Sequence, residues 1–334
     1  MSSIMKKFLI AASAASMSAI ATAPSFAYSI TGSKDAWLYD NNYGSCGPTS
    51  TCLTNDMSRL DAILGGNSSA PGGNVELFAT SEKVSLADFK NSGRTNIEGT
   101  VAGQSLTLSS LTYSDWFSTG SGLSEAYGAN NFANTWFNAF YNAAGIATNI
   151  GLALQNSTTA NALKNSLTQA TGSNIWFALS NAQIQAAAQT TAYNVFLSDA
   201  VKGFQRSSDP NISYITTSGS DLLIGLAGHY DAKAFYAPIL GTFGSLIKDG
   251  FQVSEVVKAQ YGSNPAQFLY NFSATKTNLL EVGDGLSHSG NYEVKLAGVV
   301  PPPPPASVPE PSIVFGLVGL GGLLAAKRKQ QQAG

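Results

Sequence analysis

Charged side chains are scarce in this chain of 334 residues, where 18 basic and 20 acidic residues make up only 11% of the sequence. That share is less than half of what is usual for a soluble domain. With a net charge of −2 the chain has no excess of basic residues, so we expect no nucleic-acid partner. Histidine and cysteine are also rare, with two of each, so we expect neither a metal site nor a cofactor. Hydrophobic residues reach 44%, which excludes disorder for the bulk of the chain.

The N-terminal segment has the three parts of a secretory signal peptide. Lys6 and Lys7 form a basic region, and a run of apolar and small residues follows over positions 8–23. Ser25 and Ala27 then supply small residues at the positions that precede a cut. We therefore expect signal peptidase to remove residues 1–27, cleaving between Ala27 and Tyr28.

The C-terminal segment also has three parts. A proline-rich spacer covers residues 299–308, and Pro301–Pro305 within it favour an extended polyproline conformation. An uncharged stretch over 312–326 follows, and its 15 residues are fewer than the ~20 that comfortably span a bilayer. The basic tail that ends this segment stays cytoplasmic under the positive-inside rule and consists of Lys327, Arg328 and Lys329.

Residues 309–334 resemble the sorting signal of PEP-CTERM proteins, the exosortase substrates of Gram-negative bacteria. The name-giving motif is matched by Val308 and by Pro309-Glu310-Pro311, and the short transmembrane helix is rich in glycine. The resemblance implies transient anchoring, cleavage near this motif by an exosortase-like membrane enzyme, and release to the cell surface or the extracellular polysaccharide matrix. The alternative is an ordinary membrane anchor on a proline-rich stalk, which would favour a longer apolar run.

Removing both ends changes the charge of what remains. Five of the 18 basic residues and one of the 20 acidic residues lie in the two ends, so the exported body carries a net charge of −6. An acidic body argues against anionic partners. Between Glu125 and Asp199 the only charged residue is Lys164, so the exposed surface there is expected to consist of amides and hydroxyls.

We expect an α+β fold over the exported body, residues 28–298, as one domain or two poorly separated ones. Short strands and one helix come first, a helical middle follows, and an antiparallel pair of strands closes the chain. The first helix is predicted from Pro48 to Leu64, because leucine and methionine recur at helical spacing there before Gly65 and Gly66. Alternation of Leu106 and Leu108 predicts a strand within residues 101–113.

The middle of the chain shows helical periodicity. Phe132, Trp136 and Phe140 recur every four residues before Gly145, and a second helix is predicted over 159–170, closed by Gly172. One long helix is predicted over 174–204. Five aromatic residues of the chain are expected in the core rather than in a sugar-stacking groove: Trp116, Phe132, Trp136, Phe140 and Trp176.

The last third of the body gives weaker patterns. A short helix is predicted over 254–261. Alternating apolar residues over 268–274 and 292–296 predict two strands that pair with each other.

Cys46 and Cys52 are the sharpest local feature. An exported protein with an even number of cysteines favours a disulfide. One geometric objection remains open: a helix beginning at Pro48 would include Cys52, and the two Cα atoms could then lie beyond the ~7 Å that a disulfide tolerates.

A helix starting at Pro48 would also favour a thiolate at Cys46. The run from Cys46 to Ser50 resembles the nucleophile segment of papain-like peptidases of the bacteriocin-leader type, and Gly228-His229-Tyr230 resembles the segment that carries their base. The resemblance implies Cys46 as nucleophile and His229 as base, with Asn41 or Asn42 for the oxyanion and Asp249 to orient the base. We favour the structural cysteine pair over this alternative.

The positions of the two histidines in the sequence do not indicate a metal site. His229 and His288 with Asp231 and Asp284 lack the spacing of zinc ligands, and we interpret both histidines as hydrogen-bonding surface residues. The sequence thus predicts an exported surface or matrix protein with a structural or binding role. Its expected partners are signal peptidase, an exosortase-like enzyme and extracellular polysaccharide, and the alternative function is a secreted papain-like cysteine hydrolase.

Overall fold

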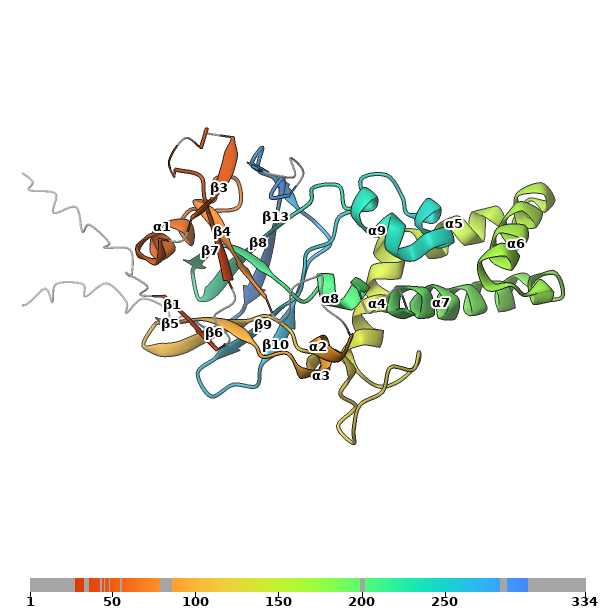
Figure 1. The fold of residues 1–334 in the computed structure, drawn as a ribbon, viewed down its shortest axis with the longest axis horizontal. Helices are drawn as coiled ribbons and strands as arrows, with labels where there is room; N and C mark the ends of the chain where they lie inside the picture. Colours follow the sequence, from red (N-terminus) through yellow and green to blue (C-terminus); the bar gives the residue numbers. More distant parts are fainter. Residues whose placement is uncertain are drawn as a thin grey trace, which may run out of the picture.

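The computed structural model describes residues 28–32, 36–42, 44, 46–47, 49–54, 56–78, 86–198, 202–282 and 287–299. They form a β half and an elongated helical lobe at opposite ends of the molecule (Figure 1). The predicted signal peptide and sorting signal lie outside the described residues. The α+β class predicted from the sequence is confirmed.

One sheet of the β half has five strands, and every neighbouring pair is antiparallel. In spatial order its strands are β1 (Ser29–Gly32), β5 (Thr95–Val101), β6 (Gln104–Ser109), β9 (Val257–Tyr261) and β10 (Gln267–Leu269). The predicted strand around Leu106 and Leu108 is confirmed as β6, and both leucines are buried.

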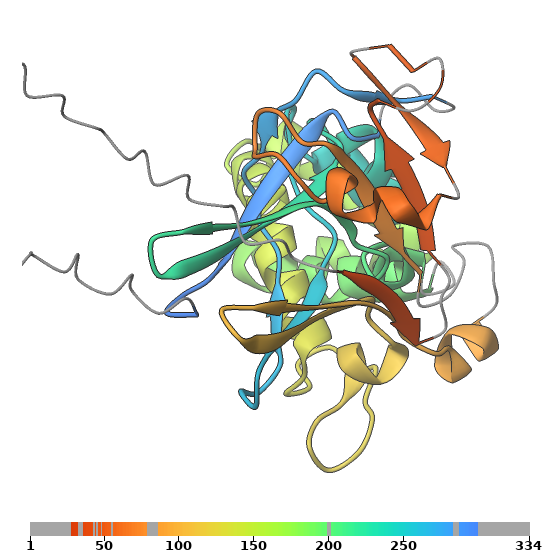
Figure 2. The same cartoon turned by 90° about the vertical axis from the view of Figure 1, so that its left-hand side faces the viewer.

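The other sheet has eight strands, and only the pairing of its last two is parallel. In spatial order they are β11 (Thr275–Lys276), β13 (Gly290–Leu296), β8 (Asp221–Gly228), β7 (Asn211–Ser218), β4 (Gly73–Leu77), β2 (Ala36–Asp40), β3 (Ser50–Thr54) and β12 (Leu280–Glu281). Seen from the β end, both sheets lie in front of the helical lobe (Figure 2).

A single apolar cluster joins the two sheets. Period-2 alternation turns Tyr292, Val294 and Leu296 of β13 inward, while Glu293 and Lys295 are exposed. The five-stranded sheet contributes residues such as Ile97 to the same cluster, together with the leucines of β6. Packing between the sheets therefore forms the core of the β half.

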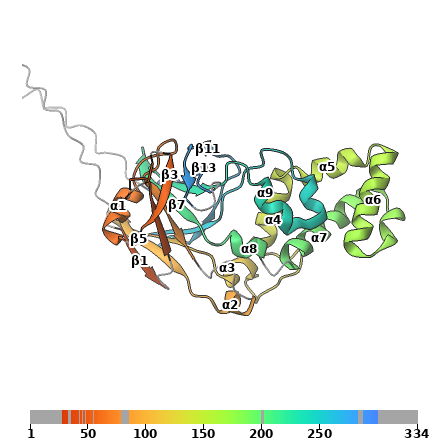
Figure 3. The same ribbon diagram turned by 45° about the horizontal axis from the view of Figure 1, so that its top comes forward.

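The helical lobe is built mainly from the chain between β6 and β7. Its helices are α2 (Leu86–Asn91), α3 (Tyr113–Phe117), α4 (Phe132–Ala143), α5 (Ile146–Ala153), α6 (Ser157–Thr171), η2 (Asn174–Phe177), α7 (Asn181–Ser198), α8 (Lys202–Arg206), α9 (Lys233–Leu240) and η3 (Gly241–Leu246), of which α2 precedes β5 and the last two follow β8. Helices α5 and α6 form the tip farthest from β1 (Figure 3).

Aromatic side chains fill the core of the lobe. Trp116, Trp136 and Phe140 are fully buried, Trp176 is nearly so, and Phe132 packs against them from a partly buried position. Their expected place in the core is confirmed. The predicted helices around Trp136 and Leu163 are confirmed as α4 and α6.

Local signals explain where these helices begin and end. Asn131 accepts a hydrogen bond from the backbone of Asn134 at the start of α4, and Asn156 does the same for Thr158 at the start of α6. Gly172 closes α6 with a φ of 68°, a conformation that favours glycine. The predicted helix over 174–204 is instead divided, because Ser180 and Gln183 form a capping box that starts α7 anew.

Two other helix predictions were wrong. Residues 50–54 form strand β3, and helical structure starts only at η1 (Met57–Arg59) and α1 (Leu60–Ile63). Leu53, counted as part of an apolar helix face, is half exposed on that strand. Residues 257–261 form β9, because Val257 and Ala259 alternate inward and the strand pairs with β6 from Lys258 to Tyr261.

The closing strand exists, but its expected partner was wrong. β13 pairs along its whole length with β8, and only the two residues of β11 join its other edge. Residues 267–269 pair with β9 in the other sheet. Phe268 of this segment faces the helical lobe and stacks on Phe132, with 4.3 Å between ring centroids.

Candidate functional site

A polar hollow of about 380 Å³ lies beside the disulfide, in the region of the eight-stranded sheet. We call it the loop hollow, because three connecting segments enclose it: the turn after β2, the loop after α1 and the segment after β11. Its lining consists of Asn41, Asn42, Ala62, Gly65, Gly66, Ser69, Ala70, Pro71, Gly72, Thr277 and Leu279. No ionisable side chain is among these residues.

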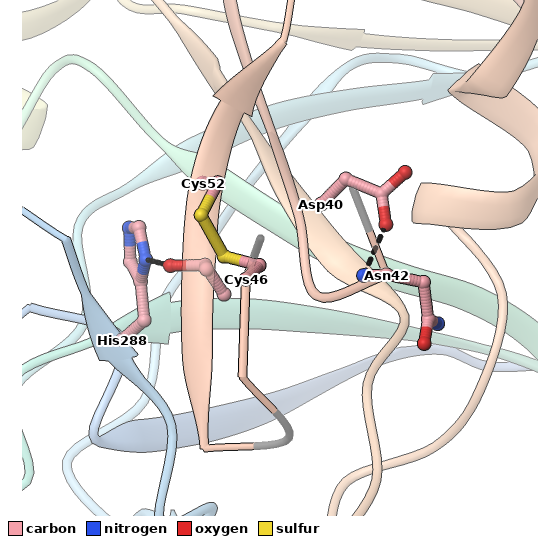
Figure 4. The surroundings of a disulfide bond; sticks show 6 residues. Asp40, Asn42, Cys46, Cys52 and His288 are labelled. Carbon is pink, nitrogen blue, oxygen red and sulfur yellow. Dashed lines mark hydrogen bonds between the residues drawn. A yellow bond between two sulfur atoms is a disulfide. The ribbon is translucent and has the colours of Figure 1, made fainter. Parts of the chain in front are cut away.

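The turn after β2 is held from both sides. Cys46 and Cys52 are joined as a disulfide, with their Cα atoms 5.9 Å apart, so the turn is tied to β3. On the other side the buried Asp40 carboxylate pairs with Arg59 and accepts a 2.7 Å hydrogen bond from the backbone N–H of Asn42 (Figure 4). These contacts fix Asn42 at the edge of the loop hollow.

The loop after α1 depends on glycine. Gly66 has a φ of +97°, which only glycine adopts readily. A Cβ atom on Gly72 would lie 2.3 Å from the Ala62 carbonyl oxygen. The side chain of Asn67 closes the loop by accepting hydrogen bonds from the backbone of Ser69 and Ala70 at 3.0 and 3.1 Å. The wall is therefore preformed.

The third wall is tied to a buried histidine. The hydroxyl of Thr277 donates to the carbonyl oxygen of His288 at 2.6 Å and accepts from the backbone N–H of Leu279 at 3.1 Å. His288 itself is only 3% exposed. His288 lies behind the wall formed by Thr277 and does not line the loop hollow.

The hydrogen bonds around His288 have a defined direction. A carboxylate only accepts, so the Asn211 amide donates to Glu255 at 3.1 Å and its oxygen is left to accept from Nδ2 of Asn74 at 2.7 Å. The same Nδ2 donates to Nε2 of His288 at 3.1 Å. Nε2 is therefore the unprotonated nitrogen.

The remaining ring nitrogen of His288 must carry the proton. Its Nδ1–H donates to the hydroxyl of Thr51 at 2.9 Å (Figure 4). Tyr39 packs edge-on against the ring, with the ring centroids 5.0 Å apart. The histidine is thus held as a neutral ring between β3 and β4.

Thr51, His288 and Asn74 resemble the parts of a nucleophile–base pair, but their burial excludes that role. Thr51 is 1% exposed and Asn74 is completely buried, so no substrate atom can reach the hydroxyl. A buried, hydrogen-bonded group of this kind acts as a brace. It holds β3, β4 and the segment after β11 together behind the loop hollow.

The structure does not bring the predicted nucleophile and base together. The sulfur of Cys46 is bonded to Cys52, and the residues that follow it form a strand, so the helix that would favour a thiolate is absent. His229 follows β8, which lies four strand positions from β3 in the sheet. At about 4.8 Å per strand that separation is about 19 Å.

His229 is instead part of the contact between β8 and the helical lobe. Its ring packs against Phe235 at 4.9 Å, and its backbone carbonyl accepts a 2.6 Å hydrogen bond from Tyr292. Asp249, suggested as an orienting residue, binds Lys233. The helix expected from Pro48 is absent, so the geometric objection to a disulfide no longer applies, and the argument for a Cys46 thiolate fails with it.

The interpretation of His288 as a surface residue was wrong. Its partners Thr51 and Asn74 lie 237 and 214 positions away in the sequence, so no local pattern could have identified the network. Asn41 and Asn42, suggested for an oxyanion hole, both line the loop hollow and lie far from His229 in the sheet. Asp284 lies outside the described residues.

Other site predictions fall partly or wholly outside what the structure describes. Of the predicted cleavage pair, Tyr28 is described and Ala27 is not. The sorting motif of Val308 and Pro309–Pro311 and the basic tail of Lys327, Arg328 and Lys329 lie beyond the described residues. None of the described helices combines the length and hydrophobicity required to cross a membrane.

Comparisons of the chain with protein-family models, with curated proteins and with solved structures found no match.

Proposed function

We propose that this chain is an exported protein of the cell surface or extracellular matrix, with a binding or structural role. Signal peptidase removes residues 1–27, and an exosortase-like membrane enzyme cleaves near Pro309-Glu310-Pro311 after transient anchoring by the C-terminal helix. The sequence pattern of the two ends motivates this proposal.

The disulfide is the structural observation that carries the export part of the proposal. The chain has two cysteines, and they are bonded to each other. Disulfides persist in the periplasm and outside the cell, whereas cytosolic reductants keep thiols reduced. The pair is therefore what an exported chain would be expected to have.

A contact of Tyr28 supports cleavage before this residue. Its backbone nitrogen lies 3.2 Å from a carboxylate oxygen of Asp61 in α1. Cleavage would turn this nitrogen into a charged ammonium, which forms a stronger, charge-assisted hydrogen bond with a carboxylate.

The shape of the molecule supports a display role. The described chain begins at β1 and ends just after β13, both in the β half, and the helical lobe extends away from this end (Figure 1). A membrane anchor following β13 would leave the lobe free to point outward. The loop hollow supports binding, because its lining provides amides and hydroxyls for hydrogen bonds.

The test is a triple substitution of the motif, Pro309→Ala, Glu310→Ala and Pro311→Ala, in a host that carries an exosortase. Wild type should appear in the medium or on the surface, and the variant should stay in the membrane fraction. A control with Pro302→Ala, Pro303→Ala and Pro304→Ala changes the spacer without touching the motif and should behave as wild type. Release of the motif variant at the wild-type level would contradict the proposal.

A further inference from the structure

We propose that the loop hollow binds one ring of a neutral carbohydrate. This inference rests on the proposed function only for the idea that the body binds a ligand, and it adds the chemical class of that ligand. It follows from the size, the charge and the rigidity of the hollow.

The size fits a single ring. A volume of about 380 Å³ lies at the lower end of the range of small-molecule sites, which starts at about 300 Å³. An extended peptide would need a longer groove, with pockets for alternate side chains. The three enclosing segments instead make one short depression.

The charge of the lining favours an uncharged ligand. The Asp40 carboxylate, on the strand just before Asn41, is paired with Arg59 and so offers no unpaired charge. An ionised ligand would lose hydration on entering and find no counter-ion among the lining residues that the structure describes. A neutral ligand bears no such cost.

The lining supplies the groups that hydroxyls need. Asn41 already donates to the Pro71 carbonyl, Asn42 donates to the Asn41 oxygen, and Ser69 donates to Asn67. What these side chains still offer a sugar hydroxyl is the second N–H of each amide, the Asn42 amide oxygen and the accepting lone pairs of the Ser69 hydroxyl. Ala62, Pro71 and Leu279 add apolar surface on which the C–H face of a ring can rest. This mixture of polar and apolar groups matches a pyranose ring better than a purely apolar molecule.

The hollow is rigid before any ligand arrives. The disulfide, the Asp40 contact to Asn42 and the bond from the Asn41 amide to the Pro71 carbonyl at 2.9 Å hold two of its walls. The Thr277–His288 bond holds the third. Preformed walls reduce the entropy that binding must offset.

The experiment measures binding of defined hexasaccharides to the purified full chain in a zwitterionic detergent, by calorimetry and by saturation-transfer NMR. The neutral probes are cellohexaose, maltohexaose, mannohexaose and xylohexaose, and the acidic probe is hexagalacturonate. We expect at least one neutral probe to bind and the acidic probe not to bind. Because the full chain is used, a failure here leaves the sorting proposal standing, and a failure of sorting leaves this test intact.

Two variants place the binding in the hollow. Ala70 is exposed at its rim, so Ala70→Phe should fill the space and weaken binding at least about tenfold. Asn42→Ala removes one amide and should weaken binding about fivefold. The control Ala186→Phe, at an exposed position of α7, should leave the affinity unchanged.

Thermal unfolding of each variant checks that the fold is retained. The proposal is overturned if no neutral probe binds, if the acidic probe binds equally well, or if Ala70→Phe leaves binding as it was. A loss caused equally by the α7 control would also overturn it, since binding would then not depend on the hollow.

Discussion

At the scale of single residues, the carboxylate of Glu255 determines the orientation of a chain of side chains. It fixes the amide of Asn211, which fixes Asn74, which in turn fixes the tautomer of His288. Each of these amides is nearly or fully buried, so a missing partner would leave a polar group without compensation.

We expect His288→Ala to lower the free energy of unfolding by about 2–4 kcal/mol. The variant loses the packing of a buried ring and leaves Thr51 and Asn74 without their partner. Urea unfolding followed by circular dichroism measures the change. His229, the other histidine, is partly exposed, so His229→Ala should lower the free energy of unfolding clearly less. Equal decreases for the two variants would argue against the bracing role of His288.

Gly73, the first residue of β4, has no room for a side chain. A Cβ atom on Gly73 would lie 2.0 Å from the carbonyl oxygen of Tyr39, whereas one on Gly47 would meet nothing within 4 Å. Gly73→Ala should therefore cost at least about 2 kcal/mol, because the β2–β4 pairing must shift. Gly47→Ala is the matched control, and similar melting temperatures for the two variants would contradict this account.

At the scale of elements, the turn between β2 and β3 shows where sequence patterns mislead. The apolar spacing of Leu53, Met57 and Leu60 predicts a helix, yet pairing with β2 and β12 makes residues 50–54 a strand. Helix propensity is weak compared with the hydrogen bonds of a sheet that the local sequence does not reveal. Without that helix the cysteines lie within reach of each other, and the disulfide that the sequence favoured is confirmed.

Helices with strong local signals were predicted well. α4 has an aromatic face and an asparagine cap, and α6 has leucines four residues apart and a closing glycine. The loop hollow carries no such signal, because its three segments meet through the pairing of β2 with β4 and β3 and of β3 with β12. The sequence could single out Asn41 and Asn42 but not their neighbours.

We expect the double substitution Cys46→Ser and Cys52→Ser to destabilise the protein by about 2 kcal/mol. A short closed loop limits the entropy that a disulfide removes from the unfolded chain. Wild type in reducing agent should match the double variant in chemical denaturation. A variant as stable as oxidised wild type would show that the turn is held by Asp40 alone.

At the scale of the whole molecule, Asp115 ties the helical lobe to the β half. It lies in α3 and binds Lys258 of β9 at 2.7 Å, and it also pairs with Arg94 before β5. Burial raises the pKa of this carboxyl, but hydrogen bonds from Lys258, the Thr112 backbone and Arg94 outweigh it, so its pKa lies below the usual value. A lowered pKa in the folded state means that the ionised carboxylate stabilises the fold.

This contribution is present above the unfolded pKa of about 3.9 and is lost as the pH falls through the lower folded value. Asp115→Asn should therefore be less stable than wild type by about 2 kcal/mol at pH 7 and lose that difference in acid. Urea midpoints from pH 7 to pH 2 test this. Asp249→Asn is the control: its hydrogen bond with Lys233 lowers the pKa of this carboxyl, but the pair is exposed and screened by solvent, so the midpoint should change little. A constant gap for Asp115→Asn across pH would refute the assignment.

The most direct test of the proposed function is the intact mass of protein recovered from the medium or cell surface, without reducing agent. The account predicts a chain that begins at Tyr28, ends near Pro309–Pro311, contains no peptide from Ile313 onward, and lacks the two thiol hydrogens that disulfide formation removes. Recovery of the complete chain through Gly334, or of a released chain with free thiols, would contradict it.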